Sequence, residues 1–203
     1  MDSVNNNIEV EIRAEVPSSD FANLFEKLKK SAKFLSHTKR VSVIFLGKVK
    51  GEYLDFRVRI DSERKAELVL KKGDFHAQDR IEVSQKINDD QFIGFVKILS
   101  LLELKSKVTE RENFIFDLGD GITLVLVKAH TIAYIEIEKM SNEYTAKKNK
   151  DELKRVLNKL GLKIIKNSKE FNNLCDRLTK LSDWVFVNTK DNIGRLTEMI
   201  DHC

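Results

Sequence analysis

The sequence predicts an α+β fold: eight mostly antiparallel strands that form a closed barrel, with flanking helices and a C-terminal helical segment. Most strand segments alternate apolar and charged residues. The connections between most of them are too short for parallel crossovers, and eight antiparallel strands can close on themselves. Helical periodicity interrupts the strands twice and dominates after residue 142. The strands are expected near residues 8–16, 40–48, 53–61, 66–72, 80–86, 104–117, 122–128 and 132–139.

The first strand, Ile8–Val16, has the clearest pattern, because apolar and charged residues alternate over nine positions. Glu9 and Glu11 carry the same charge on one face, and Arg13 follows them on that face. Like charges on one strand face repel mildly. Either a bound cation or screening by open water would relieve this repulsion.

Two helices are predicted between strands. The first spans roughly residues 19–35, after a turn at Pro17, and the second spans residues 88–102, where Asn88 and Gln91 have the spacing of a capping box. Each has one apolar stripe at intervals of three and four residues, which predicts a side that packs on the sheet. The stripes are Phe21, Leu24, Phe25, Leu28 and Ala32, and Phe92, Phe95, Val96, Leu99 and Leu102.

Turn signals separate the remaining strands. Gly51, Gly73, Gly119 and Gly121 interrupt the alternation where the chain is expected to reverse, and the polar residues 61–63 do the same. These short turns favour hairpins between neighbouring strands.

Helical patterns dominate the C-terminal part. Helices are expected over residues 151–160, 168–181 and 193–200, with Gly161 as a stop signal after the first. Residues 184–187 are compatible with a short strand or a buried turn. We therefore expect a barrel domain over residues 1–165 and a C-terminal helical extension over residues 166–203, packed on the same domain.

The composition narrows the classes of function. Of 203 residues, 33% are charged and 41% hydrophobic, which is typical of a soluble globular protein. The formal net charge is only +4, so nucleic acid is an unlikely partner. We expect no membrane span, since no apolar run approaches 18 residues. We expect a cytoplasmic protein, because the sequence has no signal-peptide pattern and its two cysteines lack metal or redox spacing. We expect it to be a monomer or a homodimer.

Charged residues of one sign recur in pairs on separate strands. Glu9 and Glu11 lie on the first predicted strand, and Glu136 and Glu138 lie on the last. Carboxylates suit a hard divalent cation such as Mg²⁺ or Mn²⁺, while arginine and lysine suit a polyanion. Together they indicate metal-dependent phosphoryl transfer. The alternative is a β-sandwich or barrel whose charged faces are simply solvated.

Six short motifs give the sequence a resemblance to a known family. They resemble, in order, the Glu-x-Glu-x-Lys, Arg-x-Arg, Leu-x-Leu-Lys, Arg-x-Glu, Arg-x-x-aromatic and aromatic-x-Glu-x-Glu elements of the CYTH superfamily, the triphosphate tunnel metalloenzymes. One motif alone is weak, but six in register over roughly residues 5–160 are specific. They are Glu9-Val10-Glu11-Ile12-Arg13, Arg57-Val58-Arg59, Leu68-Val69-Leu70-Lys71, Arg80-Ile81-Glu82, Arg111-Glu112-Asn113-Phe114 and Tyr134-Ile135-Glu136-Ile137-Glu138.

The resemblance implies a barrel with charged residues inside a tunnel and apolar strand faces outside, under the helices. It further implies a metal-dependent triphosphatase that acts on inorganic triphosphate or a small organic or nucleoside triphosphate. Alternatives are a non-catalytic polyphosphate-binding module and a class IV-type adenylate cyclase. The implied metal ligands are Glu9, Glu11, Glu136 and Glu138, for Mg²⁺ or Mn²⁺. The implied catalytic residues are Glu9, Glu11 and Lys71. The implied substrate-binding residues are Arg13, Arg57, Arg59, Lys71, Arg80, Lys107 and Arg111.

The sequence also departs from the family pattern. Arg13 stands where the family usually has lysine, and arginine does not readily give up its proton. Ser84 replaces the second glutamate of an Arg-x-Glu-x-Glu strand, and Thr109 stands where a lysine is usual. These departures indicate a divergent member of the family.

Overall fold

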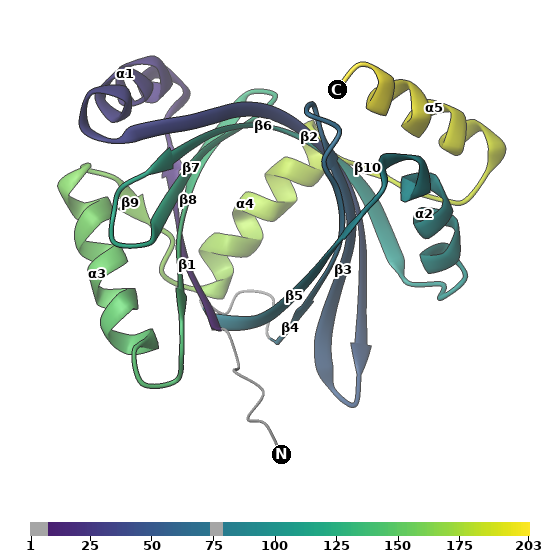
Figure 1. Ribbon diagram of the computed structural model, residues 1–203, viewed down its shortest axis with the longest axis horizontal. Coiled ribbons are helices and arrows are strands. Elements are labelled where there is room, and N and C mark those ends of the chain that lie inside the picture. Colours follow the sequence, from purple (N-terminus) through teal and green to yellow (C-terminus); the bar gives the residue numbers. More distant parts are fainter. Residues whose placement is uncertain (1–7, 74–78) are drawn as a thin grey trace.

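The computed structural model describes residues 8–73 and 79–203, and the backbone alone of Asp79 and Arg80. Within these residues, eight antiparallel strands close into a barrel, as the sequence predicts (Figure 1). The order around the barrel is β6-β2-β3-β4-β5-β1-β8-β7, and β7 pairs with β6 to complete the ring. These strands are β1 (Ile8–Val16), β2 (Lys33–Val49), β3 (Glu52–Asp61), β4 (Ala66–Lys72), β5 (Asp79–Ile87), β6 (Lys105–Asp117), β7 (Ile122–Ala129) and β8 (Ile132–Ser141).

Strand β1 pairs much more extensively with one of its two neighbours in the barrel than with the other. Strand β1 pairs with β8 along its whole length, from Ile8 to Val16. Its pairing with β5 is limited, among the described residues, to three residue pairs between Ile8–Val10 and Asp79–Ile81. The strands β1 and β5 are therefore held together at one end only, and this seam is the weakest lateral contact of the barrel.

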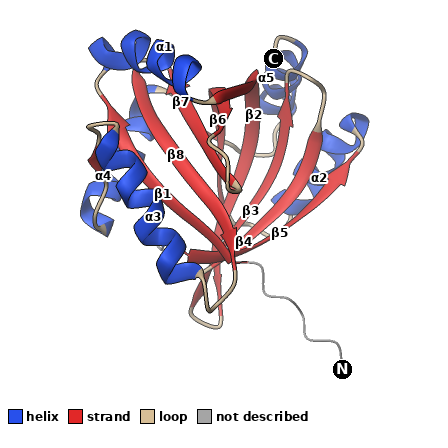
Figure 2. Ribbon diagram, turned by 60° about the vertical axis from the view of Figure 1, so that its left-hand side comes forward, coloured by secondary structure: helices blue, strands red, loops and turns tan. Residues whose placement is uncertain are grey.

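Helices cover the outside of the barrel because the outward strand residues are apolar. The described helices are α1 (Phe21–Ser31), α2 (Phe92–Ser100), α3 (Ala146–Lys159), α4 (Ser168–Leu181) and α5 (Lys190–Asp201), with short 3-10 turns η1 (Ser18–Asp20) and η2 (Asp89–Gln91). Figure 2 shows α3 lying along β1 and β8. The two-residue strands β9 (Lys163–Ile164) and β10 (Trp184–Val185) pair with β1 and β6 respectively.

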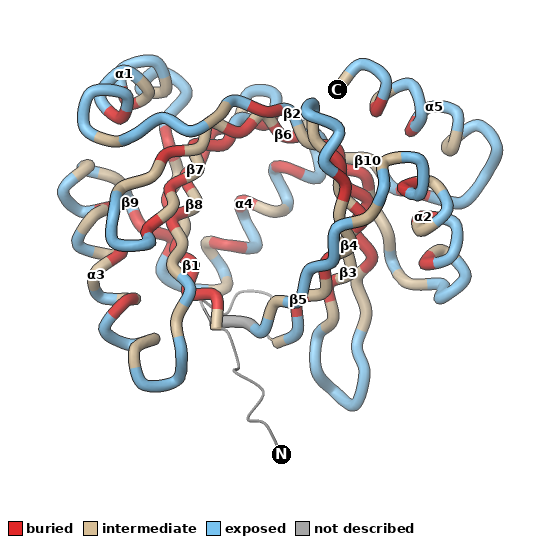
Figure 3. Tube along the Cα trace, in the orientation of Figure 1, coloured by how far each residue is buried: buried red, intermediate tan, exposed pale blue. Residues whose placement is uncertain are grey.

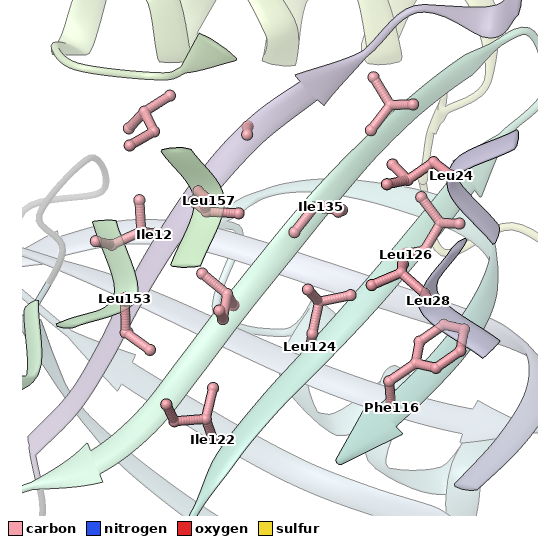
Figure 4. Close-up of a cluster of buried hydrophobic side chains, with 14 of the residues drawn as sticks. Ile12, Leu24, Leu28, Phe116, Ile122, Leu124, Leu126, Ile135, Leu153 and Leu157 are labelled. Carbon is pink, nitrogen blue, oxygen red and sulfur yellow. The ribbon is translucent and has the colours of Figure 1, made fainter. Parts of the chain in front are cut away.

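Two cores lie between helices and barrel, where buried stretches of strand face the helices (Figure 3). In the first, Leu24 and Leu28 of α1 and Leu153 and Leu157 of α3 pack against outward residues such as Ile135 (Figure 4). In the second, residues of α2 and α5 pack against the outer face of β2 and β3. Burying one such leucine contributes about 1.5–3 kcal/mol. The apolar faces therefore point outward, and the charged faces are left to the interior.

Helix α4 differs from the other helices because it packs on inward-facing residues. Its Phe171, Leu174 and Leu178 cluster with Val127 and Tyr134 of β7 and β8. In the view of Figure 1, α4 crosses the opening of the barrel. The helix therefore occupies one end of the barrel interior.

Several element boundaries differ from those expected. The first helix ends at Ser31 rather than near residue 35, because β2 begins at Lys33 and pairs with β6 from there. Phe34, expected in the helix, packs on Phe116 and Phe25 instead. Helices α3 and α5 both begin earlier than their apolar stripes indicated. The domain division at residue 165 stays a prediction. In the described part of the chain, no helix is both long enough and apolar enough to cross a bilayer.

Candidate functional site

The charged faces of the strands enclose a cavity of about 730 Å³ inside the barrel. Alternation places the charged residues of β1 inward, while Val10 and Ile12 between them lie in the outer core. The cavity brings together nine of the charged residues of interest from β1, β2, β3, β4 and β8. They are Glu9, Glu11, Arg13, Arg40, Arg57, Arg59, Lys71, Glu136 and Glu138.

Arg13 joins two of the predicted metal ligands. Its Nε lies 3.1 Å from an Oε1 of Glu136, and its guanidinium also pairs with Glu11. Burial alone would raise the pKa of Glu136, but the charges of Arg13 and Arg40 lower it to about 2. Glu136 is therefore ionised at neutral pH and held by Arg13.

Lys71 joins a second acidic pair. Its Nζ lies 2.8 Å from Glu9 and 2.5 Å from Glu82, and all three side chains are largely shielded from solvent. Burial raises the pKa of Glu9 to about 8, against the attraction of Lys71. Burial opposes the ionised form of Glu82 as well, but a hydrogen bond from Glu9 and the charge of Lys71 lower the pKa of Glu82 to about 2. The proton of this pair therefore resides on Glu9.

Unlike Glu136 and Glu9, Glu138 has no described cation paired with it. It stands directly opposite Glu11 across β1 and β8, and its side chain makes no ion pair or hydrogen bond with the described residues. Burial, and then the charges of Glu11 and Glu136, raise its pKa to about 7. A buried carboxylate facing other carboxylates fits a site where a divalent cation binds.

The carboxylates are nevertheless not arranged as a finished metal site. Among residues 8–73 and 79–203, no group of three or more His, Cys, Asp or Glu side chains is placed to hold a metal ion. The reason is that Glu9, Glu11 and Glu136 face cations in this structure. The donor chemistry fits Mg²⁺ or Mn²⁺, and binding would require these ion pairs to open.

The basic wall of the cavity lies on β3 and β2. Arg57 pairs with Asp55 at 2.6 Å, and Arg59 pairs with Glu67 at 2.7 Å and with Glu82 at 3.6 Å. Both arginines keep the planar guanidinium that binds phosphate oxygens two at a time.

Arg40 lies beside these arginines without a partner of its own. No described residue forms an ion pair or a side-chain hydrogen bond with it. Burial, and then the charge of Arg59, lower its pKa. Arg40 is not among the site residues expected from the sequence, although the outward core positions of Val41 and Val43 indicate that Arg40 points inward.

Two of the predicted substrate-binding residues, Lys107 and Arg111, are not among the described residues that line the cavity. The side chains of Lys107 and Arg111 both pair with Asp183, which follows α4. Arg80 stands opposite Glu9 in the pairing of β1 with β5, but its side chain lies outside the described part of the structure. Their binding roles therefore stay predictions.

The sequence matches the model of one protein family. The sequence signature of the CYTH domain covers residues 7–170, which is most of the chain. The chain belongs to the CYTH domain family. A comparison with curated proteins finds no match. The CYTH family includes triphosphatases, and its triphosphate tunnel enzymes generally depend on a divalent metal.

Solved structures resemble this CYTH protein in fold. A protein from Pyrococcus horikoshii OT3 has a TM-score of 0.67 and 18% identity, with 83% of this chain and 99% of that chain covered. A conserved hypothetical protein from Pyrococcus furiosus has a TM-score of 0.62 and 22% identity, with 76% and 91% covered. A putative adenylyl cyclase from Hippeastrum, described as having a dominant triphosphatase activity, has a TM-score of 0.53 and 18% identity, with 80% and 91% covered. At such identities the likeness shows the fold alone, so activity must be argued from the site.

Proposed function

We propose that this CYTH protein is a divalent-metal-dependent triphosphatase. Its substrate is inorganic triphosphate or a small organic or nucleoside triphosphate, bound inside the barrel. The observation that carries the proposal is Arg40, a cavity-lining cation that has no acidic partner among the described residues and lies near Arg59. A partly buried, unpaired cation is unfavourable on its own, and an anionic ligand would offset that cost.

The basic wall would bind the triphosphate. Arg40, Arg57 and Arg59 come from adjacent strands and line the same cavity. Their guanidinium groups would bind the phosphate oxygens and neutralise the charge that builds on them during transfer. Arg13 and Lys71 would join them once their carboxylate partners turn to another cation.

The acidic wall would hold Mg²⁺ or Mn²⁺ through Glu9, Glu11, Glu136 and Glu138. A divalent cation bound there would withdraw charge from the phosphoryl oxygens and polarise the attacking water. Glu9 and Glu11 are proposed as catalytic because they would orient that cation against the reacting phosphate. Lys71, 2.8 Å from Glu9, is proposed as catalytic because it would stabilise the charge of the transferred group.

A second candidate function is the binding of triphosphate or polyphosphate without turnover. One observation favours it: Glu9, Glu11 and Glu136 are already paired with Lys71 or Arg13. If those ion pairs persist when the substrate binds, the chain has a phosphate clamp but no place for a metal ion.

Phosphate release from tripolyphosphate tests the proposal, with Mg²⁺, with Mn²⁺ and with a chelator. We expect metal-dependent release by the wild type and its loss in the Glu9→Gln/Glu11→Gln variant. The control is Glu143→Gln, which changes an exposed glutamate in the loop after β8. Equal rates in wild type and double variant would refute the triphosphatase. Tight binding without metal or turnover would support the clamp.

The same assay identifies the substrate. Thiamine triphosphate, ATP and GTP are compared with tripolyphosphate, and formation of cyclic AMP from ATP would indicate a cyclase instead. The cytoplasmic location and the monomer or homodimer state stay predictions from the sequence.

A further inference from the structure

The carboxylate of Asp183 lies at the closed end of the barrel and pairs with two cations. Its Oδ2 lies 2.7 Å from Nζ of Lys107, and its Oδ1 lies 2.7 Å from Nη2 of Arg111. The Asp183 side chain is completely shielded from solvent. Ser182 accepts a further hydrogen bond from Arg111 at 3.0 Å. One acidic residue therefore pairs with two cations that face the interior and offsets one of their two charges.

These two cations continue the basic wall of the cavity. Arg111 stands directly opposite Arg40 across β2 and β6, and Lys107 lies on the same face of β6 as Arg111. Arg40 lines the cavity, whereas Arg111 and Lys107 are absent from its lining. The row of cations thus extends past the cavity, and Asp183 pairs with the two cations beyond Arg40.

Helix α4 lies next to these cations, and its Thr179 accepts a hydrogen bond from Lys107 at 3.2 Å. Phe171, Leu174 and Leu178 pack on the inward-facing Val127 and Tyr134. The ring of Phe171 lies 5.0 Å from the guanidinium of Arg13, at the inner limit of the site. The apolar face of α4 therefore borders the site at this end.

We propose that Asp183 sets the length of the polyanion that the cavity accepts, an inference that rests on the proposed function. A linear polyphosphate longer than triphosphate would have to extend from Arg40 toward Arg111 and Lys107. Both cations are already engaged by Asp183 and are not among the residues that line the cavity. The site therefore favours short linear triphosphates and gains nothing from further phosphate units. Asp183 acts here as a residue that determines substrate specificity.

Calorimetric titration with a chain-length series tests this inference, because it measures binding separately from turnover. The ligands are pyrophosphate, tripolyphosphate, tetrapolyphosphate and long-chain polyphosphate, added to the full chain. For the wild type we expect affinity to rise from pyrophosphate to tripolyphosphate and then to stay level. In Asp183→Asn, Arg111 and Lys107 become available, and the preference for tetrapolyphosphate over tripolyphosphate should rise about tenfold.

Three variants separate this effect from a change of net charge or a loss of stability. Asp176→Asn makes the same charge change at an exposed position of α4 and should leave the chain-length preference unchanged. Asp183→Asn/Arg111→Gln should lose most of the gain, because one freed cation is gone. If Asp183→Asn does not fold, Asp183→Asn/Lys107→Gln removes one cation together with the carboxylate and should keep part of the gain at Arg111.

The outcomes separate this inference from the proposed function. Binding of tripolyphosphate with an unchanged chain-length preference in Asp183→Asn would overturn the role of Asp183 alone. If the wild type binds longer polyphosphates progressively more tightly, the proposed role of Asp183 is likewise overturned. A wild type that binds no polyphosphate at all would overturn the proposed function, and this inference with it.

Discussion

Arg40 and Arg111 stand directly opposite each other on β2 and β6, yet of the two only Arg111 has an acidic partner in the described structure. The difference arises from the C-terminal segment, which brings Asp183 to the side chain of Arg111, whereas beside Arg40 its Cys203 contacts only the backbone carbonyl of Lys39. An unpaired cation in the cavity lining marks a place for a ligand, whereas Arg111 is paired with Asp183 and is not part of that lining. The boundary of the candidate site therefore lies between these two residues.

The first prediction concerns Arg40. Arg40→Gln removes one charge-assisted contact to phosphate, so tripolyphosphate should bind roughly 10- to 100-fold more weakly. Without ligand, the variant should be as stable as the wild type or slightly more stable, because an unpaired cation has been removed. Calorimetry measures the affinity, and thermal unfolding measures the stability.

Lys39→Gln is the matched control for Arg40, since it removes a neighbouring cation of β2 that is exposed on the outside. Its affinity for tripolyphosphate should equal that of the wild type. Equal affinity in Arg40→Gln as well would show that the phosphate lies elsewhere.

The barrel was predictable because its signals are local. Alternation along Ile8–Val16 and the short turns at Gly51 and Gly119 are properties of a few neighbouring residues. The cavity lining followed from the same alternation, which is why Glu9, Arg57 and Glu136 were found.

The state of each charge could not be predicted in this way. Lys107 and Arg111 lie at positions of β6 whose side chains point into the barrel, as alternation predicts. Their partner Asp183, however, is more than 70 positions away in sequence and reaches them only through the packing of α4. Arg40 was missed for the complementary reason. Arg40 matters because no described acidic side chain pairs with it in the folded protein, and the residues near it in sequence do not reveal this. Long-range packing thus decides which inward cations are free.

The second prediction concerns Glu138. Burial and the charge of Glu11 raise the pKa of Glu138 to about 7 in the folded protein. At a pH above the pKa that Glu138 has in the unfolded chain, ionisation of this side chain therefore destabilises the folded state. Glu138→Gln should therefore raise the free energy of unfolding at about pH 8 by about 1–3 kcal/mol in the absence of metal. At the same time it should weaken Mn²⁺ binding. Urea unfolding and calorimetry measure the two effects, and Glu143→Gln should change neither. A loss of stability in Glu138→Gln would contradict this account.

The third prediction is the pH dependence of metal binding. Burial raises the pKa of Glu9 to about 8 and that of Glu138 to about 7. At lower pH a metal ion must displace protons from these carboxyls, so affinity for Mn²⁺ should increase from about pH 6 to about pH 9. The increase should be smaller in Glu138→Gln, which has one fewer proton to displace. Calorimetry in buffers of different ionisation enthalpy would count the released protons. A pH-independent affinity would show that these carboxyls do not bind the metal.

The fourth prediction concerns Lys71, which holds Glu9 and Glu82 together. In Lys71→Met the largely shielded Glu82 carboxylate and the protonated Glu9 lose the cation that both of them face, which should cost about 3–5 kcal/mol of stability without metal. Added Mg²⁺ or Mn²⁺ should stabilise this variant more than the wild type, because the metal no longer competes with the ammonium group.

Lys72→Met is the control: the neighbouring lysine is exposed and pairs with Glu52 at 2.6 Å, so its loss should cost at most about 1 kcal/mol. Urea unfolding with and without metal decides the matter. If metal stabilises Lys71→Met no more than it stabilises the wild type, Glu9 is not a metal ligand, and the metal must be sought among the remaining carboxylates of the cavity.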